Sequence, residues 1–202
     1  QLKEREPERF DIARLHPNDL YAFQEADYER LEELLKQERI IAVGESDWII
    51  IGMMKPQDQK TGFIRQIRLA QKYNKPILFN ERGNEDDAGH SEGYGSAEGI
   101  MHCYSGSKEV AMELIKIGFY ISFGGPLTFK NSRGAPATVE ALPLNRLFVE
   151  TDSPIDAASV QGKQNEPMYV RYTFDKLCEI KAVEKDLAAE QLRKNYEELF
   201  LK

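Results

Sequence analysis

The sequence predicts an α/β fold of the (β/α)8 TIM-barrel type, in one domain that spans residues 1–202. Short apolar segments alternate with amphipathic helical segments, which is the order of a parallel sheet covered by helices. The apolar segments show no alternation, as in strands that are buried on both faces. Polar residues follow their carboxyl ends, where a barrel gathers its functional residues. An open doubly wound sheet is the alternative, but the chain carries neither of the glycine-rich phosphate-binding motifs.

The individual elements follow from periodicity. Six strands are expected, at 10–15, 40–44, 76–79, 99–103, 118–123 and 146–150. Helices are expected at 24–37, 58–73, 107–117, 134–142, 166–181 and 186–200. The apolar run 48–54 fits core, a lid or a subunit contact equally well, and 81–98 has no apolar periodicity. Six strands are too few for a complete barrel, so the barrel is expected to be incomplete.

Composition bears on the class of function. Hydrophobic residues make up 41% of the chain and charged residues 30%, which predicts a soluble domain with a real core. No run of about 18 apolar residues is present, which excludes a membrane span. The start lacks a secretory signal, and Cys103 and Cys178 are expected as reduced thiols of a cytoplasmic protein. The net charge of −7 argues against a broad basic surface, so a nucleic-acid substrate would need a local basic patch or metal ions.

Polar residues at the strand ends are the first candidates for chemistry. The strands run into His16, Glu45, Asn80, His102, Gly124 and Asp152. Glu45, His102 and Asp152 form a candidate set of ligands for Zn²⁺, Mn²⁺ or Mg²⁺. A metal pair could generate hydroxide from water and stabilise an in-line displacement at phosphorus. Taken singly, each residue fits a structural role at least as well: a loop acid, a hydrogen-bonded histidine and a turn residue.

The remaining candidates carry less weight. Cys103 follows His102 directly, so on a strand the two side chains would face opposite sides, which argues against a Cys–His nucleophilic pair. Cys103 is therefore expected as a small buried hydrophobe, and Cys178 as a core residue of its helix. Four basic residues are candidates for local phosphate contacts or for solvated surface: Lys130, Arg133, Lys163 and Arg171.

Several long strings resemble one family. The segments "MHCYSGS", "GFYISFGGPLTFKN", "LPLNRLFVETDSP" and "NEPMYVRY" are similar to the TatD-like metal-dependent deoxyribonucleases, a family of amidohydrolase-type barrels. The resemblance covers nearly the whole chain and is strongest over 99–200. It implies a (β/α)8 barrel with two divalent metal ions at its mouth, which hydrolyses phosphodiester bonds in DNA.

The resemblance also implies roles for single residues. Glu45 matches the acid that bridges the two metals, and Asp152 matches an aspartate ligand, so both are expected to be catalytic. His102 matches a histidine ligand. His16 matches the histidine of the family's H-P turn and is expected to help hold the substrate phosphate.

The departures from the family pattern concern the metal ligands. The family opens with a strand that bears a His-x-His pair, and nothing in this chain corresponds to it. Asn80 stands where the family has a histidine ligand, and the family's G-E-x-G-L-D turn becomes "GESDWII". The chain is therefore expected to be an N-terminally shortened barrel without its first βα units. Its depleted site is expected to hold Mg, Mn or Zn weakly or in part.

Two functions remain open at this point. The first is a TatD-like hydrolase of DNA phosphodiester bonds, impaired, with missing ligands supplied by water, Asp47 or a partner chain. The second is a non-catalytic or altered barrel that serves as a scaffold or interaction module. An incomplete barrel would also expose the edges of its first and last strands. The chain is therefore expected either to self-associate through those edges or to rearrange into a closed or open smaller sheet, and the apolar 48–54 run could supply the cover.

Overall fold

The computed structural model describes residues 11–13, 15, 24–44, 48–49, 56–79, 81–82, 98–153 and 164–201. Six strands form one sheet in the order β1-β2-β4-β6-β7-β8, and every neighbouring pair is parallel. They are β1 (Asp11–Ala13), β2 (Ile40–Val43), β4 (Ile77–Phe79), β6 (Gly99–Met101), β7 (Tyr120–Phe123) and β8 (Leu147–Val149). The six expected strands are confirmed, each shortened by one or more residues.

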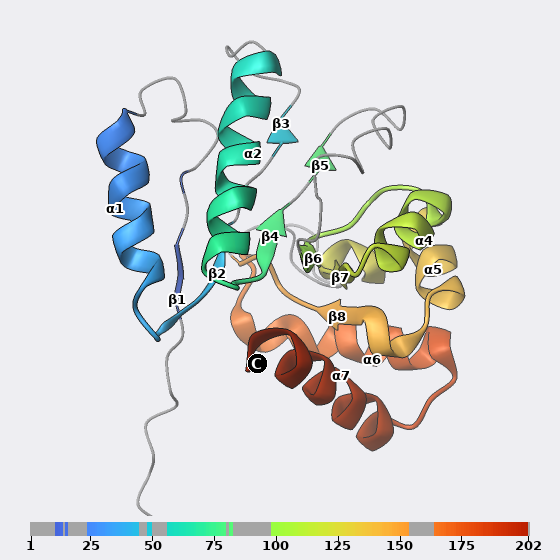
Figure 1. Ribbon diagram of the computed structural model, residues 1–202. Helices are drawn as coiled ribbons and strands as arrows, with labels where there is room; N and C mark the ends of the chain where they lie inside the picture. Colours follow the sequence, from blue (N-terminus) through green and yellow to red (C-terminus); the bar gives the residue numbers. More distant parts are fainter. Residues whose placement is uncertain are drawn as a thin grey trace, which may run out of the picture.

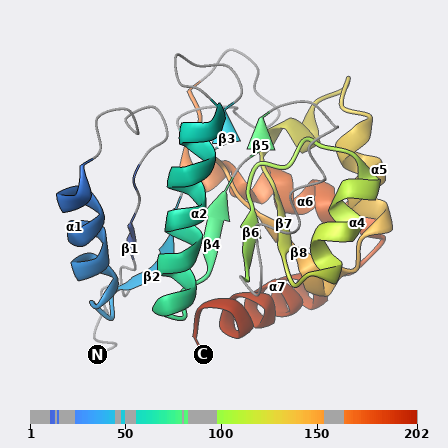
Figure 2. The ribbon, with the colours of Figure 1, turned by 45° about the horizontal axis from the view of Figure 1, so that its top comes forward.

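Helices follow the strands as expected. They are α1 (Glu25–Leu35), α2 (Pro56–Lys72), α4 (Lys108–Lys116), α5 (Gly134–Ala141), α6 (Val170–Lys181) and α7 (Lys185–Phe200). Short 3-10 turns stand at η3 (Gly125–Thr128), η4 (Leu144–Arg146) and η5 (Pro167–Tyr169). Figures 1 and 2 show α1, α2 and α4 along one face of the sheet, with α7 across the end opposite the strand tips.

The main core lies between the sheet and these helices. Leu31 and Leu35 of α1 are 2% and 1% exposed, as their helical spacing predicts. Phe79 of β4 packs edge-on against Phe119, with ring centroids 5.4 Å apart, and against Phe63 of α2 at 5.5 Å. These contacts hold the middle strands rigidly and fix where their carboxyl ends lie.

A second, two-stranded sheet was not expected. It pairs β3 (Trp48–Ile49) with β5 (Glu81–Arg82) in parallel. The strands that precede them in the chain, β2 and β4, are neighbours in the main sheet, with Val43 opposite Ile77. The segments that follow two neighbouring strands of the main sheet thus pair with each other as well. Among the described residues, β3 pairs with β5 and not with either edge of the main sheet.

The described sheet does not close. Its two outer strands, β1 and β8, pair with no further strand among the residues that the structure describes. The expectation of an incompletely closed barrel holds for this part of the chain. No helix of the described residues has the length and apolar character that crossing a bilayer requires.

Candidate metal site at the strand ends

Two of the three predicted metal ligands line one cavity at the carboxyl ends of the strands. His102 follows β6 and Asp152 follows β8, and the cavity between them measures about 500 Å³. We call it the metal cavity. Its walls are Leu78, His102, Glu150, Thr151, Asp152, Ser153, Pro167 and Val170. Three other predicted site positions, Glu45, Asn80 and His16, lie outside the described residues.

His102 is held by its backbone and faces a carboxylate. Its N–H donates to the carbonyl of Phe79 at 2.9 Å, which continues the pairing of β4 and β6 past the end of the strand. Only 6% of His102 is exposed, and its Nε2 atom is buried. Its Nδ1 atom lies 3.6 Å from Oε1 of Glu150. Metal-binding histidines present one ring nitrogen to the ion and turn the other toward a carboxylate or carbonyl, so this arrangement fits a ligand.

Glu150 connects the ends of three neighbouring strands. It follows β8, and its Oε1 accepts the N–H of Cys103, beyond β6, at 2.6 Å. Its Oε2 accepts the hydroxyl of Ser122 in β7, also at 2.6 Å. Both are short hydrogen bonds, so the carboxylate is held firmly between the two neighbouring strand ends. Sequence reasoning missed Glu150 and Ser122, although Glu150 stands inside the "VETDSP" string that carried the prediction for Asp152.

Asp152 sits in a strained turn directly after β8. Its φ is +52°, in the left-handed region, where aspartate occurs more readily than most residues other than glycine. The side-chain amide of Asn165 donates to the carbonyl of the preceding Thr151, which fixes this turn from the segment before α6. Non-glycine residues in this conformation cluster at functional sites, where the surrounding structure compensates for the strain. The turn therefore supports a site role for Asp152 over the role of an ordinary loop residue.

The donors in the metal cavity fit a divalent cation in part. Imidazole nitrogen and carboxylate oxygen are ligands of Zn²⁺ and Mn²⁺, and carboxylate suits Mg²⁺ as well. Within the described ranges, no group of three or more His, Cys, Asp and Glu side chains is arranged to hold an ion. The two donors that could hold one are His102 and Asp152. The third predicted ligand, Glu45, directly follows Gly44, whose φ of +134° ends β2 in a conformation reserved for glycine.

The expectation for Cys103 is wrong in two respects, because the residue does not lie on a strand and is only half-buried. β6 ends at Met101, so Cys103 lies in the turn beyond it, with φ +48°, and strand alternation does not apply. Its side chain is half-buried and lines a different cavity from that of His102. The absence of a Cys–His pair thus follows from the turn. Cys178, by contrast, is 5% exposed, and burial raises its pKa, which confirms it as a core residue.

The predicted phosphate contacts are solvent-exposed where the structure describes them. Lys130 and Arg133 lie between η3 and α5, on the carboxyl side of β7, and Arg171 lies in the first turn of α6. The guanidinium of Arg171 donates to the hydroxyl of Tyr172 at 2.8 Å. Lys163 lies outside the described residues. Three of the four candidates are therefore on the surface, where phosphate could reach them.

A parallel α/β sheet with a histidine and an aspartate at its strand ends is typical of barrel-type metal-dependent hydrolases. The family model for TatD-related DNases matches residues 1–201, and this chain belongs to that family. The relationship confirms the resemblance seen in the sequence.

Individual relatives agree with this assignment. The uncharacterized metal-dependent hydrolase YabD of Bacillus subtilis is 38% identical over 190 residues, which cover 92% of this chain and 74% of YabD. The uncharacterized metal-dependent hydrolase YcfH of Escherichia coli K12 is 33% identical over 192 residues, covering 92% and 70%. The crystal structure of YJJV, a TatD homolog from Escherichia coli K12, superposes with a TM-score of 0.85 at 28% identity, covering 96% of this chain and 77% of YJJV. The predicted TIM-barrel type of fold is confirmed.

Proposed function

We propose that this chain is a divalent-metal-dependent hydrolase of phosphodiester bonds in DNA, working in the cytoplasm. The observation that carries the proposal is the convergence of His102 and Asp152 in one cavity at the carboxyl ends of β6 and β8. Membership of the TatD-related DNase family supports hydrolysis of DNA as the reaction. The relatives named as metal-dependent hydrolases support a metal.

In this proposal the metal ligands are Glu45, His102 and Asp152, with Glu45 and Asp152 catalytic and His16 contacting the phosphate. A bound Mg²⁺, Mn²⁺ or Zn²⁺ would supply a Lewis acid for the phosphate oxygens and lower the pKa of water. Water attacks phosphorus and one P–O ester bond breaks, which leaves a phosphomonoester and an alcohol that takes up a proton.

The protein's part is to keep the donors in place before substrate arrives. His102 is buried and anchored to β4 through its backbone N–H. Glu150 faces its Nδ1 and thereby favours the tautomer with the proton on Nδ1, which leaves Nε2 as the donor. The left-handed turn fixes the direction in which Asp152 leaves β8. Because Asn80 replaces a ligand histidine of the family pattern, we propose that the ion is held weakly or in part.

Calorimetric titration with Mg²⁺, Mn²⁺ and Zn²⁺, paired with hydrolysis of single-stranded and duplex DNA, tests this function. Asp152→Asn is the informative variant, because asparagine also tolerates the left-handed turn while removing the charge. We expect a loss of metal affinity of at least about tenfold and a matching loss of hydrolysis. Glu45→Ala is expected to behave in the same way, and Glu109→Ala, an exposed acid in the first turn of α4, serves as the control.

Two results would contradict the proposal. Hydrolysis that persists unchanged in Asp152→Asn would remove this residue from the reaction. A chain that takes up no metal at millimolar concentration and cleaves no DNA would favour the second candidate, a non-catalytic scaffold or interaction module. That candidate has its support in the substituted ligand position at Asn80.

A further inference from the structure

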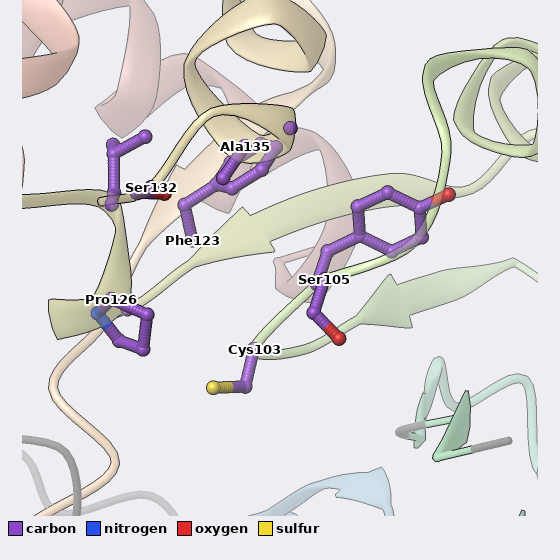
Figure 3. Close-up of a pocket in the computed structure, with 10 residues that line it drawn as sticks. Cys103, Ser105, Phe123, Pro126, Ser132 and Ala135 are labelled. Atoms are coloured by element: carbon purple, nitrogen blue, oxygen red, sulfur yellow. The ribbon is translucent and has the colours of Figure 1, made fainter. Parts of the chain in front are cut away.

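A second cavity opens beside the metal cavity at the same end of the sheet. It measures about 310 Å³ and lies past the ends of β6 and β7, between the turn after β6 and the segment that leads into α5. Its walls include Cys103, Ser105, Phe123, Pro126, Leu127 and Ser132. Figure 3 shows Cys103 on one side of the opening and Pro126 and Ser132 on another.

The two cavities share a wall. Cys103 lines the second cavity, and its backbone N–H is bonded to Glu150, which lines the first. Gly124 completes the wall: a Cβ atom there would lie 3.5 Å from Sγ of Cys103 and 3.7 Å from Cγ of Glu150. A ligand group in the second cavity would thus be separated from the metal cavity by little more than one layer of protein atoms. Because both cavities lie at the carboxyl ends of the strands, two groups joined by a short linker that passes over this wall could occupy both at once.

The lining of the second cavity suits a flat, mostly apolar group with polar edges. Phe123, Pro126 and Leu127 supply apolar walls, and the hydroxyls of Ser105 and Ser132 supply polar atoms. Ligand pockets in proteins have this character, with mostly apolar walls and a few polar groups that set orientation. Its volume is near the lower end of the range of about 300–1,000 Å³ for such pockets, so it has room for one ring system rather than several.

Two basic residues close in the chain to the wall of the second cavity favour a phosphorylated ligand. Lys130 and Arg133 flank Ser132 in the chain, and both are exposed. In the described part of the chain, neither forms an ion pair with another residue, in a protein whose net charge is −7. Two exposed cations with no acidic partner among the described residues favour the approach of phosphate. Arg133 stands in the chain between Ser132 and Gly134, which both line the cavity, so this mostly apolar cavity has a cation next to its wall in the chain.

We propose that the second cavity is a base pocket, which receives one nucleobase of a nucleotide whose phosphodiester lies in the metal cavity. A nucleobase is a planar ring system with hydrogen-bonding edges, and proteins hold unstacked bases between apolar or aromatic groups and polar side chains. The sugar provides the short link between base and phosphate that the shared wall requires. The assignment rests on the proposed function, and it names an unpaired nucleotide unit as the substrate class, since a base in a duplex cannot enter the pocket.

Protection of the Cys103 thiol measures occupancy of the pocket directly. Cys178 is 5% exposed and its pKa is raised by burial, so N-ethylmaleimide at neutral pH is expected to modify Cys103 first. The probes are deoxyadenosine monophosphate and, as the matched ligand without a base, 2-deoxyribose 5-phosphate, both without metal. At ten times its Kd the nucleotide slows modification of Cys103 about tenfold, while the sugar phosphate at the same concentration leaves the rate unchanged. Mass spectrometry of the modified peptide reads out each rate.

Two variants on α5 separate the pocket from the rest of the protein. Ala135→Phe fills the pocket and is expected to abolish protection by the nucleotide, whereas Ala137→Phe, at an exposed position of the same helix, leaves protection intact. Ser132→Leu provides a second filling variant if Ala135→Phe does not fold, as judged by circular dichroism. Equal protection by the sugar phosphate, or protection that survives both filling variants, would overturn the base pocket.

Protection of the Cys103 thiol tests the base pocket independently of metal binding. Protection by nucleotide in an Asp152→Asn protein that binds no metal supports the pocket even if hydrolysis fails. Metal-dependent cleavage without nucleotide protection supports the proposed function and refutes the pocket. Protection by leucine amide but not by the nucleotide would assign the cavity to an apolar side chain of a peptide and refute the base.

Discussion

At the scale of single residues, the site depends on a carboxylate that sequence reasoning did not select. Glu150 bonds the backbone of Cys103 and the side chain of Ser122, and it faces His102. It thereby fixes three strand ends relative to one another before any ligand binds. Positions of this kind orient metal ligands without touching the ion, and their loss commonly costs about 10–100-fold in metal affinity.

Glu150→Ala is expected to weaken both the fold and the site. The change leaves the Cys103 N–H and the Ser122 hydroxyl without their acceptor, so the free energy of unfolding should fall by about 1–3 kcal/mol in urea denaturation. Metal affinity measured by calorimetry should fall about 10–100-fold, because the carboxylate that faces Nδ1 of His102 is removed.

Ser122→Ala is the matched control for Glu150→Ala. It removes one of the two hydrogen bonds and leaves the carboxylate in place, so the loss of stability should be smaller, about 0.5–1.5 kcal/mol. Metal affinity should stay near that of the unchanged protein. Equal losses of metal affinity in both variants would show that Glu150 acts on the fold alone.

At the scale of elements, the outer edge of β8 is covered by a helix. The N–H of Glu150 donates to Phe123 of β7 at 3.0 Å, so alternation turns the polar groups of Leu147 toward the open edge. There the side-chain amide of Asn195, a residue of α7 that is 0% exposed, donates to the carbonyls of Leu147 at 2.9 Å and Leu144 at 3.0 Å. A buried side chain thus occupies hydrogen-bonding positions that another strand would use.

The variant Asn195→Leu tests whether the hydrogen bonds from the Asn195 side chain stabilise the edge of β8. Leucine has a similar size but cannot donate. The carbonyl of Leu147 loses the bond from Asn195, whereas that of Leu144 keeps the N–H of Leu147, so the free energy of unfolding should fall by about 1–3 kcal/mol. Lys194→Leu, on the same helix, removes an exposed ion pair with Glu190 and should cost at most about 1 kcal/mol. Chemical denaturation measures the free energy of unfolding of both variants. Equal losses in the two variants would mean that the edge of β8 is stabilised by packing alone.

At the scale of the whole molecule, the two outer strands of the described sheet differ. A helix covers the edge of β8, whereas β1 carries an exposed apolar side chain. α7 lies against β8, whereas Ile12 of β1 is 44% exposed at the other edge. Self-association was expected through both outer strands. Because α7 covers the edge of β8, we now expect a second chain to pair with β1 rather than with β8. Self-association itself stays a prediction.

Sedimentation velocity of the unchanged chain and of the Ile12→Lys variant tests self-association through β1. A lysine on an edge strand opposes pairing with a second chain, so the dimer fraction is expected to fall in the variant. Met112→Lys, at an exposed position of α4, adds the same single positive charge away from the edge strand. A chain that sediments as a monomer at 100 times the assay concentration would refute the prediction.

The sequence by itself determined the parallel α/β class, the order of six strands and the pair His102 and Asp152. Strands buried on both faces and amphipathic helices leave periodicities that are local, and residues after a strand are found by counting along the chain. The short pair β3–β5 and the edge cover from Asn195 left no such pattern, because each depends on which segments become neighbours after folding.

Only the tertiary structure decided the shape of the site. The left-handed turns at Cys103 and Asp152 and the carboxylate bridge from Glu150 depend on packing between β6, β7 and β8, which no local pattern encodes. The same turn that separates Cys103 from His102 places the thiol in a second cavity. Local periodicity therefore predicted where functional residues lie in the chain, whereas long-range contacts decided which of them meet and which space they enclose.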